Sequence, residues 1–185
     1  MKRIVLTFGF IAGGMLAVMM LATLPFMDRI GFDHGEVIGY TTMVLAFLMV
    51  YFGIRSYRDN VGGGTIGFGR AFAVGLLITL IATSCYVATW EVIYYKMMPD
   101  FGEKYAAYVM QHARDAGASP QQLAAKAKEM ADFQQMYRNP LVNVAFTFLE
   151  PLPVGLVMTL VCAGVLSRRR RRPADAGAVA GIAAV

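Results

Sequence analysis

The fold is decided by a stretch near the C-terminus, NVAFTFLEPLPVGLVMTLVCA at residues 143–163. It is apolar and, at about 20 residues, long enough for a helix to cross the hydrocarbon core of a bilayer. It also contains a carboxylate, Glu150, which is followed at once by Pro151, Pro153 and Gly155. A charge beside helix-weakening residues is costly in lipid, so the presence of Glu150 in this span must serve either a structural or a functional role.

The composition of the whole chain also favours a membrane protein. Of its 185 residues 57% are hydrophobic and 16% are charged, whereas soluble domains carry roughly 25% charged residues. The apolar residues fall into four blocks of spanning length, at about residues 4–25, 37–54, 71–95 and 141–166. The first block is longer than the core of a signal peptide, so we expect it to be a retained span.

The segment between the third and fourth blocks is polar and different in kind. Residues 100–138 contain two helical periodicities that are interrupted at Gly117. Ser119 and Gln122 form a capping-box pattern at the start of the second one. One face of the first helix carries Phe101, Tyr105, Tyr108 and His112. We therefore predict an amphipathic helical hairpin that ends before Asn139-Pro140.

The predicted fold is all-α, a four-transmembrane-helix bundle with an extracytoplasmic hairpin between the third and fourth spans. The spans and the hairpin form one domain at residues 1–167, followed by a basic tail at 168–185 that we expect to be disordered and cytoplasmic. Basic residues gather in three segments, 2–3, 55–70 and 168–172. By the positive-inside rule these segments and both termini are cytoplasmic, while the acidic loop at 28–36 and the hairpin are outside.

Two acidic residues, Glu91 and Glu150, lie inside predicted spans. Ser84 shares a face of the third span with Glu91, and Asn143 and Thr147 share a face of the fourth span with Glu150. If these faces meet, they form a buried polar network, which is either a proton- or cation-binding site of a small transporter or an interhelical clamp. We expect Glu150 to be protonated or bound to a neighbour. The neighbours available to it are Asn143, Thr147, Ser84, Tyr86 and Trp90.

Small residues recur every four positions along several of the spans. Such stripes allow two helix backbones to approach closely in a membrane. The glycines that we expect at helix–helix contacts are Gly9, Gly13, Gly75 and Gly155.

The glycine-rich loop at residues 60–70 contains a formal G-x-G-x-x-G pattern. A dinucleotide site needs a preceding strand, and here a membrane helix precedes the loop, so we expect a flexible turn that enters a tightly packed helix. An alternative is a site for a lipid phosphate, formed by the amides of Gly63 and Gly64 with Arg58 and Arg70.

No catalytic, metal or cofactor site is expected. Asp33, His34 and Glu36 are close in sequence, but they lack the spacing of a tetrahedral site and are predicted to lie in a solvated loop. No nucleophile, base and orienting group can be assembled, so we do not expect an enzyme. The expected partners are the bilayer, anionic lipid headgroups at the cytoplasmic face, and a second copy of the chain or another membrane protein. The net charge of +5 points to a membrane surface rather than to nucleic acid.

Four motifs resemble a known bacterial family: FGIRSYRD (52–59), GGGTIGFGRAF (62–72), NP (139–140) and LEPLPVGL (149–156). The chain resembles the domain-of-unknown-function family forty-one ninety-nine (DUF4199). This resemblance implies four membrane helices with an outer segment before the last, and it implies no activity. We therefore expect an integral protein of the bacterial inner membrane with a non-enzymatic structural, accessory or partner-binding role. The alternative is a subunit of a small proton- or cation-coupled transporter that uses Glu150.

Overall fold

The computed structural model describes residues 1–167, and every regular element in that part of the chain is helical. The elements are α1 (Lys2–Thr23), η1 (Leu24–Phe26), α2 (Met27–Asn60), α3 (Phe68–Val92), η2 (Ile93–Met97), α4 (Phe101–Asp115), α5 (Pro120–Tyr137), α6 (Pro140–Leu149) and α7 (Pro151–Leu166). The predicted all-α fold class is confirmed. The tail at residues 168–185, which we expected to be disordered, lies outside the described residues.

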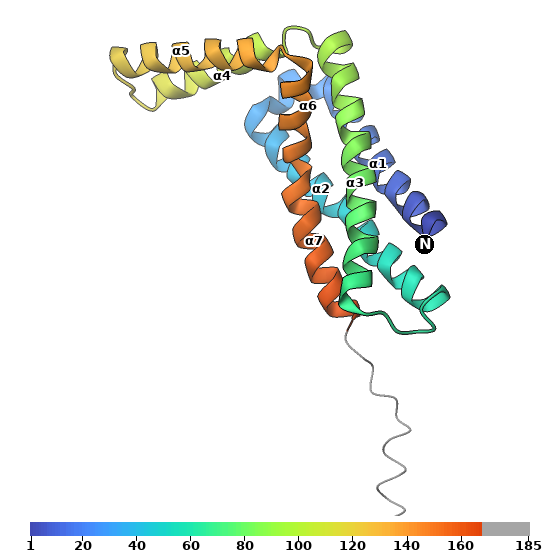
Figure 1. The fold of residues 1–185 in the computed structure, drawn as a ribbon. Helices are drawn as coiled ribbons and strands as arrows, with labels where there is room; N and C mark the ends of the chain where they lie inside the picture. Colours follow the sequence, from blue (N-terminus) through green and yellow to red (C-terminus); the bar gives the residue numbers. More distant parts are fainter. Residues whose placement is uncertain (168–185) are drawn as a thin grey trace, which may run out of the picture.

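Four helical segments are long and apolar enough to cross a membrane, as predicted. They are Lys2–Phe26, Arg29–Asn60, Phe68–Met97 and Pro140–Leu166. The turn η1 extends the first, the π-helical turn η2 extends the third, and α6 and α7 together form the fourth. The segments run alternately up and down (Figure 1). Many of their apolar side chains are exposed, as expected of surfaces that face lipid.

The second span begins earlier than the sequence indicated. Residues 28–36, which we expected to form an acidic loop, are helical on both sides of Gly31. Gly31 has φ 70° and ψ 167°, a conformation that glycine adopts readily because it has no Cβ. The chain bends at this one residue and returns at once to helix, which places Glu36 on α2.

Helices α3 and α7 pack through two reciprocal pairs of glycine and threonine. A Cβ at Gly155 would lie 2.3 Å from the methyl carbon of Thr79, and a Cβ at Gly75 would lie 2.8 Å from the methyl carbon of Thr159. The hydroxyl oxygens of Thr79 and Thr159 are 3.1 Å apart, and both side chains are fully buried. The small residues of the two helices therefore allow a close approach, which a hydrogen bond between the threonines reinforces.

Helix α1 approaches α3 in the same way. A Cβ at Gly9 would lie 2.9 Å from Ile81, and a Cβ at Gly13 would lie 2.6 Å from the Cβ of Cys85. The structure thus places all four of the glycines singled out in the sequence at contacts between helices.

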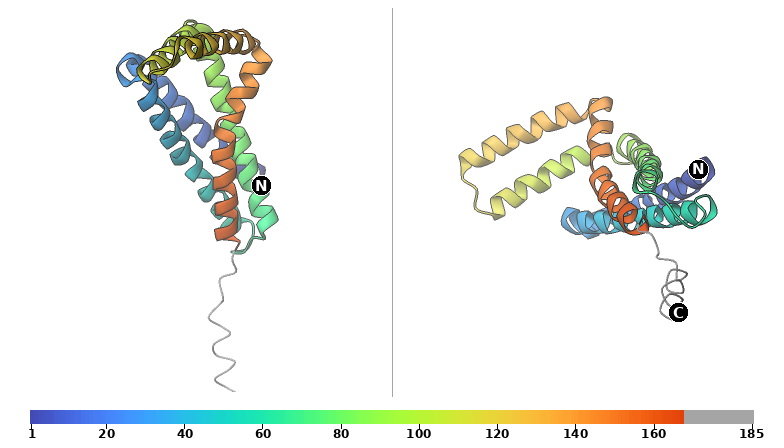
Figure 2. Two further views of the ribbon diagram at one scale, coloured as in Figure 1. Left: turned by 90° about the vertical axis from the view of Figure 1, so that its left-hand side faces the viewer. Right: turned by 60° about the horizontal axis from the view of Figure 1, so that its bottom comes forward.

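Helices α4 and α5 form a hairpin that lies across one end of the bundle (Figures 1 and 2). Gly117, with φ 77°, stands in the turn between them. The predicted capping box is present, because Ser119 Oγ accepts from the Gln122 amide at 3.3 Å and the Ser119 amide donates to Gln122 Oε1 at 2.8 Å. The opposite end of the bundle carries the loop at residues 61–67 and the end of α7 (Figure 1).

A candidate cation-binding cavity

The fourth span is broken at Glu150. Helix α6 ends at Leu149 and helix α7 begins at Pro151. Pro151 and Pro153 have no backbone N–H, so neither can donate to the carbonyl four residues earlier, and the helical hydrogen bonding is interrupted. The two helices meet at an angle (Figure 2). The side chain of Glu150 projects from this break.

Glu150 lines a cavity of about 570 Å³ on the hairpin side of the bundle. The walls come from α1, α2, α3 and α6, and residues of the hairpin cover it. Its surface is mainly aromatic and aliphatic side chains with several methionines, and no Lys or Arg occurs among the described residues that line it. Its lining residues with polar groups include Glu36, Tyr40, Tyr86, Trp90, Tyr137 and Glu150.

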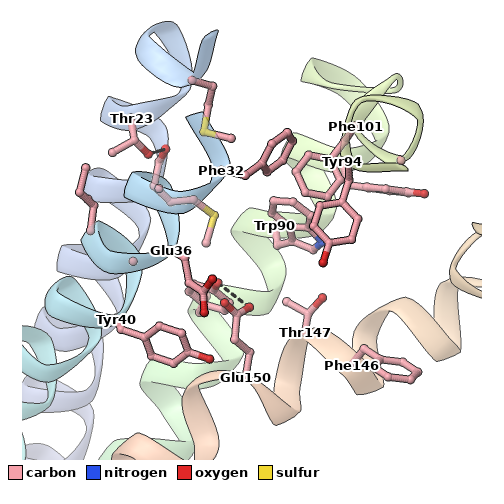
Figure 3. A pocket seen from close by; sticks show the side chains of 18 of the residues that line it. Thr23, Phe32, Glu36, Tyr40, Trp90, Tyr94, Phe101, Phe146, Thr147 and Glu150 are labelled. Carbon is pink, nitrogen blue, oxygen red and sulfur yellow. Dashed lines mark hydrogen bonds between the residues drawn. The ribbon is translucent and has the colours of Figure 1, made fainter. Parts of the chain in front are cut away.

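Two carboxylates enter the cavity from different helices. Glu36 projects from α2 and Glu150 from the break in the fourth span, and the two side chains point toward one another (Figure 3). The Tyr86 hydroxyl, from α3, donates to Glu150 Oε2 at 2.8 Å. This arrangement concentrates negative charge at one place in a mainly apolar cavity.

A chain of hydrogen bonds runs along the wall beside Glu150. Trp90 Nε1 donates to the Tyr137 hydroxyl at 3.1 Å, and the hydroxyls of Tyr137 and Thr147 are 3.3 Å apart. Thr147 Oγ1 donates to Asn143 Oδ1 at 3.2 Å. Because an indole N–H can only donate, the Tyr137 proton is directed to Thr147. Burial raises the pKa of Tyr137 above the ordinary value of a phenol, which is already protonated at neutral pH. The chain joins α3, α5 and α6.

The hairpin is held over the cavity by contacts with the start of α2. The ring of Phe32 lies with its centroid 5.9 Å from that of Phe101 and 4.9 Å from that of Tyr108. The Tyr108 hydroxyl donates to Asp33, and His112 Nε2 lies 3.6 Å from Asp33 Oδ2. The hydrogen bond to Asp33 raises the pKa of Tyr108 to about 12. The face of α4 identified from its periodicity is therefore the face that docks on α2.

The structure does not bring the other predicted polar residues of α3 into this network. Ser84 is exposed, and its hydroxyl donates to the Leu80 carbonyl of its own helix at 2.8 Å. Glu91 has one buried carboxylate oxygen, Oε1, which has no hydrogen-bond partner within residues 1–167. The α3 residue that bonds Glu150 is Tyr86, which lies on a different face of the helix.

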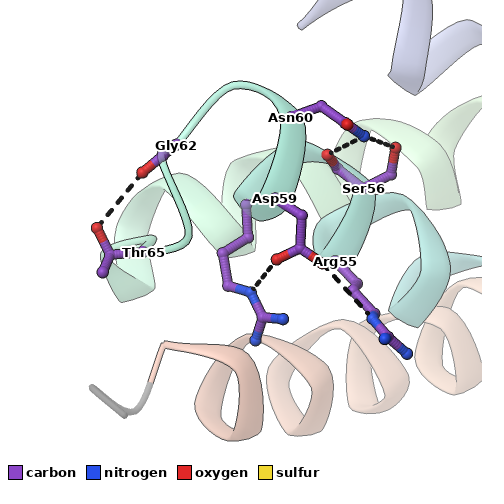
Figure 4. Close-up of polar contacts among 7 residues, drawn as sticks. Arg55, Ser56, Asp59, Asn60, Gly62 and Thr65 are labelled. Atoms are coloured by element: carbon purple, nitrogen blue, oxygen red, sulfur yellow. Dashed lines mark hydrogen bonds and ion pairs between the residues drawn. The ribbon is translucent and has the colours of Figure 1, made fainter. Parts of the chain in front are cut away.

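The loop between α2 and α3 makes contacts within itself (Figure 4). Gly63 and Gly64 have φ of 60° and 86°, and the Gly64 amide donates to the Arg58 carbonyl at 3.0 Å. Arg58 Nε donates to Asp59 Oδ1 at 2.7 Å. Arg70 lies in the first turn of α3. Two groups considered for a lipid phosphate, the Gly64 amide and Arg58 Nε, thus already donate hydrogen bonds to neighbouring residues of the chain.

Glu36 was expected in a solvated loop with Asp33 and His34, and this expectation was wrong, because the residue lies on α2 and lines the cavity with Glu150. A signal was present, since Glu36, Tyr40, Met43 and Phe47 recur at helical spacing and the last two are buried. Extending that periodicity back past residue 37 would have placed Glu36 on the inner face of the second span.

These features define an α-helical, multi-pass membrane protein with a carboxylate- and aromatic-lined cavity at one end of its bundle. A family model described as "Protein of unknown function (DUF4199)" matches residues 7–168, and the chain belongs to this family. The resemblance seen in the four sequence motifs is therefore confirmed. No curated protein and no solved structure matches the chain significantly.

Proposed function

We propose that this chain is a non-enzymatic protein of the bacterial inner membrane that binds a proton or another cation in its cavity, as a subunit of a small cation-coupled transporter. The observation that carries this proposal is the pair Glu36 and Glu150, which face one another with no Lys or Arg among the described residues that line the cavity. An ionised carboxylate in apolar surroundings is costly unless a positive charge compensates it. A bound proton or cation supplies that charge.

In this proposal the hairpin lies outside the cytoplasm and both termini lie inside it. The support is the position of Arg55, Arg58 and Arg70 around the loop at the end of the bundle opposite the hairpin. Glu150 then lies about 24 Å along α7 from Leu166 at 1.5 Å per residue. A hydrocarbon core is about 30 Å thick, so this distance puts Glu150 in its outer half.

A transport role is favoured by the break in the fourth span. Discontinuous membrane helices form the binding sites of many transporters, because the interrupted backbone leaves helix ends and carbonyl groups to coordinate a bound ion. On the side away from the hairpin the bundle is closed by fully buried residues such as Phe47, Ile78 and Thr79. Passage of a cation therefore requires a change of conformation. Four helices leave little room for a path within one chain, so transport also implies self-association.

Ion flux in proteoliposomes tests this function. A pH gradient or a cation gradient is imposed, and its decay is followed with an enclosed fluorescent indicator at matched protein amounts. We expect the parent protein to dissipate the gradient and Glu150→Gln to lose this activity, because Gln has nearly the same shape but cannot exchange a proton. Glu91→Gln, which changes a carboxylate outside the cavity, is the control and should retain the flux. If the parent protein carries no flux, the proposed cation-coupled transport is contradicted.

An accessory role that depends on partner proteins is the second candidate, and the hairpin supports it. The hairpin extends away from the bundle (Figure 2), and none of the residues of α4 or α5 is fully buried. Such a surface is available to another protein at the membrane face. A photo-crosslinking residue at the exposed Gln121 should capture a defined partner in gently solubilised membranes, whereas one at the exposed Gly14 of α1 should capture lipid.

A further inference from the structure

We propose that the cavity binds a lipophilic organic cation, an ammonium or phosphonium ion with an apolar body, whose charge lies between Glu36 and Glu150. This inference rests on the proposed cation-binding role and names the class of cation. It follows from the size of the cavity, its aromatic walls and its charge.

The cavity is too large for an inorganic ion alone. Its volume of about 570 Å³ falls within the roughly 300–1,000 Å³ typical of sites for small organic molecules. Inorganic cations also need several oxygen, nitrogen or sulfur ligands. Within residues 1–167 no group of three or more His, Cys, Asp or Glu side chains is placed to hold a metal. The two carboxylates supply charge without completing a coordination shell.

Aromatic side chains surround the two carboxylates. Tyr40 projects from α2, Trp90 from α3 and Tyr94 from the π-helical turn η2, and all three face the cavity (Figure 3). Tyr137 of the hairpin adds a fourth ring. The faces of such rings attract organic cations, and the attraction is larger in sites without water. Aromatic rings and carboxylates together are the chemistry that recognises an alkyl or aryl ammonium ion.

The rest of the wall fits an apolar body. Five methionines line it, Met19, Met20, Met27, Met43 and Met130, and their flexible side chains adapt to ligands of different shape. A phospholipid amine shares the ammonium chemistry but carries a phosphate beside it. No Lys or Arg among the described lining residues is available to that phosphate, and the two carboxylates repel it. The occupant that fits is therefore a free organic cation.

Binding of tetraphenylphosphonium tests this inference, with tetraphenylborate as an anion of the same shape. The chain has one tryptophan, Trp90, so its fluorescence reports on the cavity wall. We expect saturable quenching by tetraphenylphosphonium in nanodiscs of phosphatidylglycerol, and none by tetraphenylborate. Glu150→Gln should weaken the binding by at least about tenfold, because it removes one charge of the pair. Glu36→Gln, on a different helix, should do the same, and Glu91→Gln should bind like the parent.

Four different results would contradict the inference that the cavity binds a lipophilic organic cation. Equal binding of the borate, or affinity unchanged in both Glu36→Gln and Glu150→Gln, would show that no cation site exists between the two carboxylates. Competition by phosphatidylethanolamine added to the nanodiscs would assign the cavity to a lipid amine. If tetraphenylphosphonium fails to bind while the parent still carries Glu150-dependent flux, only the ligand class is wrong and the proposed function stands.

Discussion

The Tyr86 hydroxyl donates a hydrogen bond of 2.8 Å to Glu150 Oε2, which joins α3 to the break in the fourth span. This bond lies at the point where Pro151 interrupts the helical ladder. It holds the carboxylate at the edge of the cavity, among the residues that line it. The bond therefore has both a structural and a functional consequence, and the two can be separated by substitution.

The structural consequence is tested by thermal unfolding in detergent. Glu150→Gln keeps a carbonyl oxygen that can accept from Tyr86, so we expect little change in stability. Glu150→Ala and Tyr86→Phe should each lower the free energy of unfolding by about 0.6 kcal/mol, the average for interhelical hydrogen bonds in membranes. The double variant should cost little more than either single one. Fully additive effects would show that the two groups do not interact.

Close packing between α3 and α7 predicts a contrast between two glycines of the same helix. Gly155→Ala places a Cβ against Thr79, whose hydroxyl is held by Thr159, so we expect a loss of about 1–3 kcal/mol. Gly164→Ala is the matched control, because a Cβ there meets nothing within 4 Å. It should leave the stability unchanged or raise it slightly, since alanine is the better helix former. Equal melting temperatures for both variants would contradict the packing.

The orientation is tested with reporter fusions. Fusions at residue 62 and after residue 172 should behave as cytoplasmic, and a fusion at residue 118, in the turn of the hairpin, as external. The physical reason is the gathering of basic residues in three alternating segments of the chain. An external signal at residue 62 would reverse the assignment and place the cavity on the cytoplasmic side.

The contact between Tyr108 and Asp33 predicts that the docking of the hairpin on α2 weakens at strongly alkaline pH. The folded pKa of Tyr108 is raised from 10 to about 12. A raised pKa means that this contact stabilises the docked hairpin fully below pH 10 and that the stabilisation is lost as the pH rises through about 12. Titration by NMR of ¹³C-labelled tyrosines, with Tyr108→Phe for assignment, gives the midpoint. Asp33→Asn should lower it toward 10, and an unchanged midpoint would contradict the contact.

The sequence was sufficient for the features set by local chemistry. Apolar blocks of spanning length, the capping box of Ser119 and Gln122, and the docking face of α4 all depend on nearby residues, and the structure has each of them. The bend at Gly31 could not be predicted with the same assurance. Glycine permits both a loop and a single-residue bend between helices, and the contacts of Phe32 with the hairpin favour the second.

The candidate site was only partly predictable for a related reason. Glu150 was identifiable because a carboxylate in an apolar span is unusual. Which residues face it depends on how the helices are rotated about their axes, and single-sequence periodicity does not fix the rotation of a span that is apolar on all sides. Tyr86 was therefore one of several possible partners, and Glu36 became visible as the second carboxylate only once α2 was seen to begin at Met27.

The central claim is that Glu150 takes up a proton or another cation in an apolar cavity, and carbodiimide labelling tests it most directly. Dicyclohexylcarbodiimide is apolar and reacts with protonated carboxylic acids, and mass spectrometry of the digested protein locates the adduct. We predict modification of Glu150 in membranes at neutral pH, loss of ion flux in step with that modification, and no such adduct in Glu150→Gln. Adducts on other carboxylates of the chain with Glu150 and Glu36 both unmodified would contradict the account.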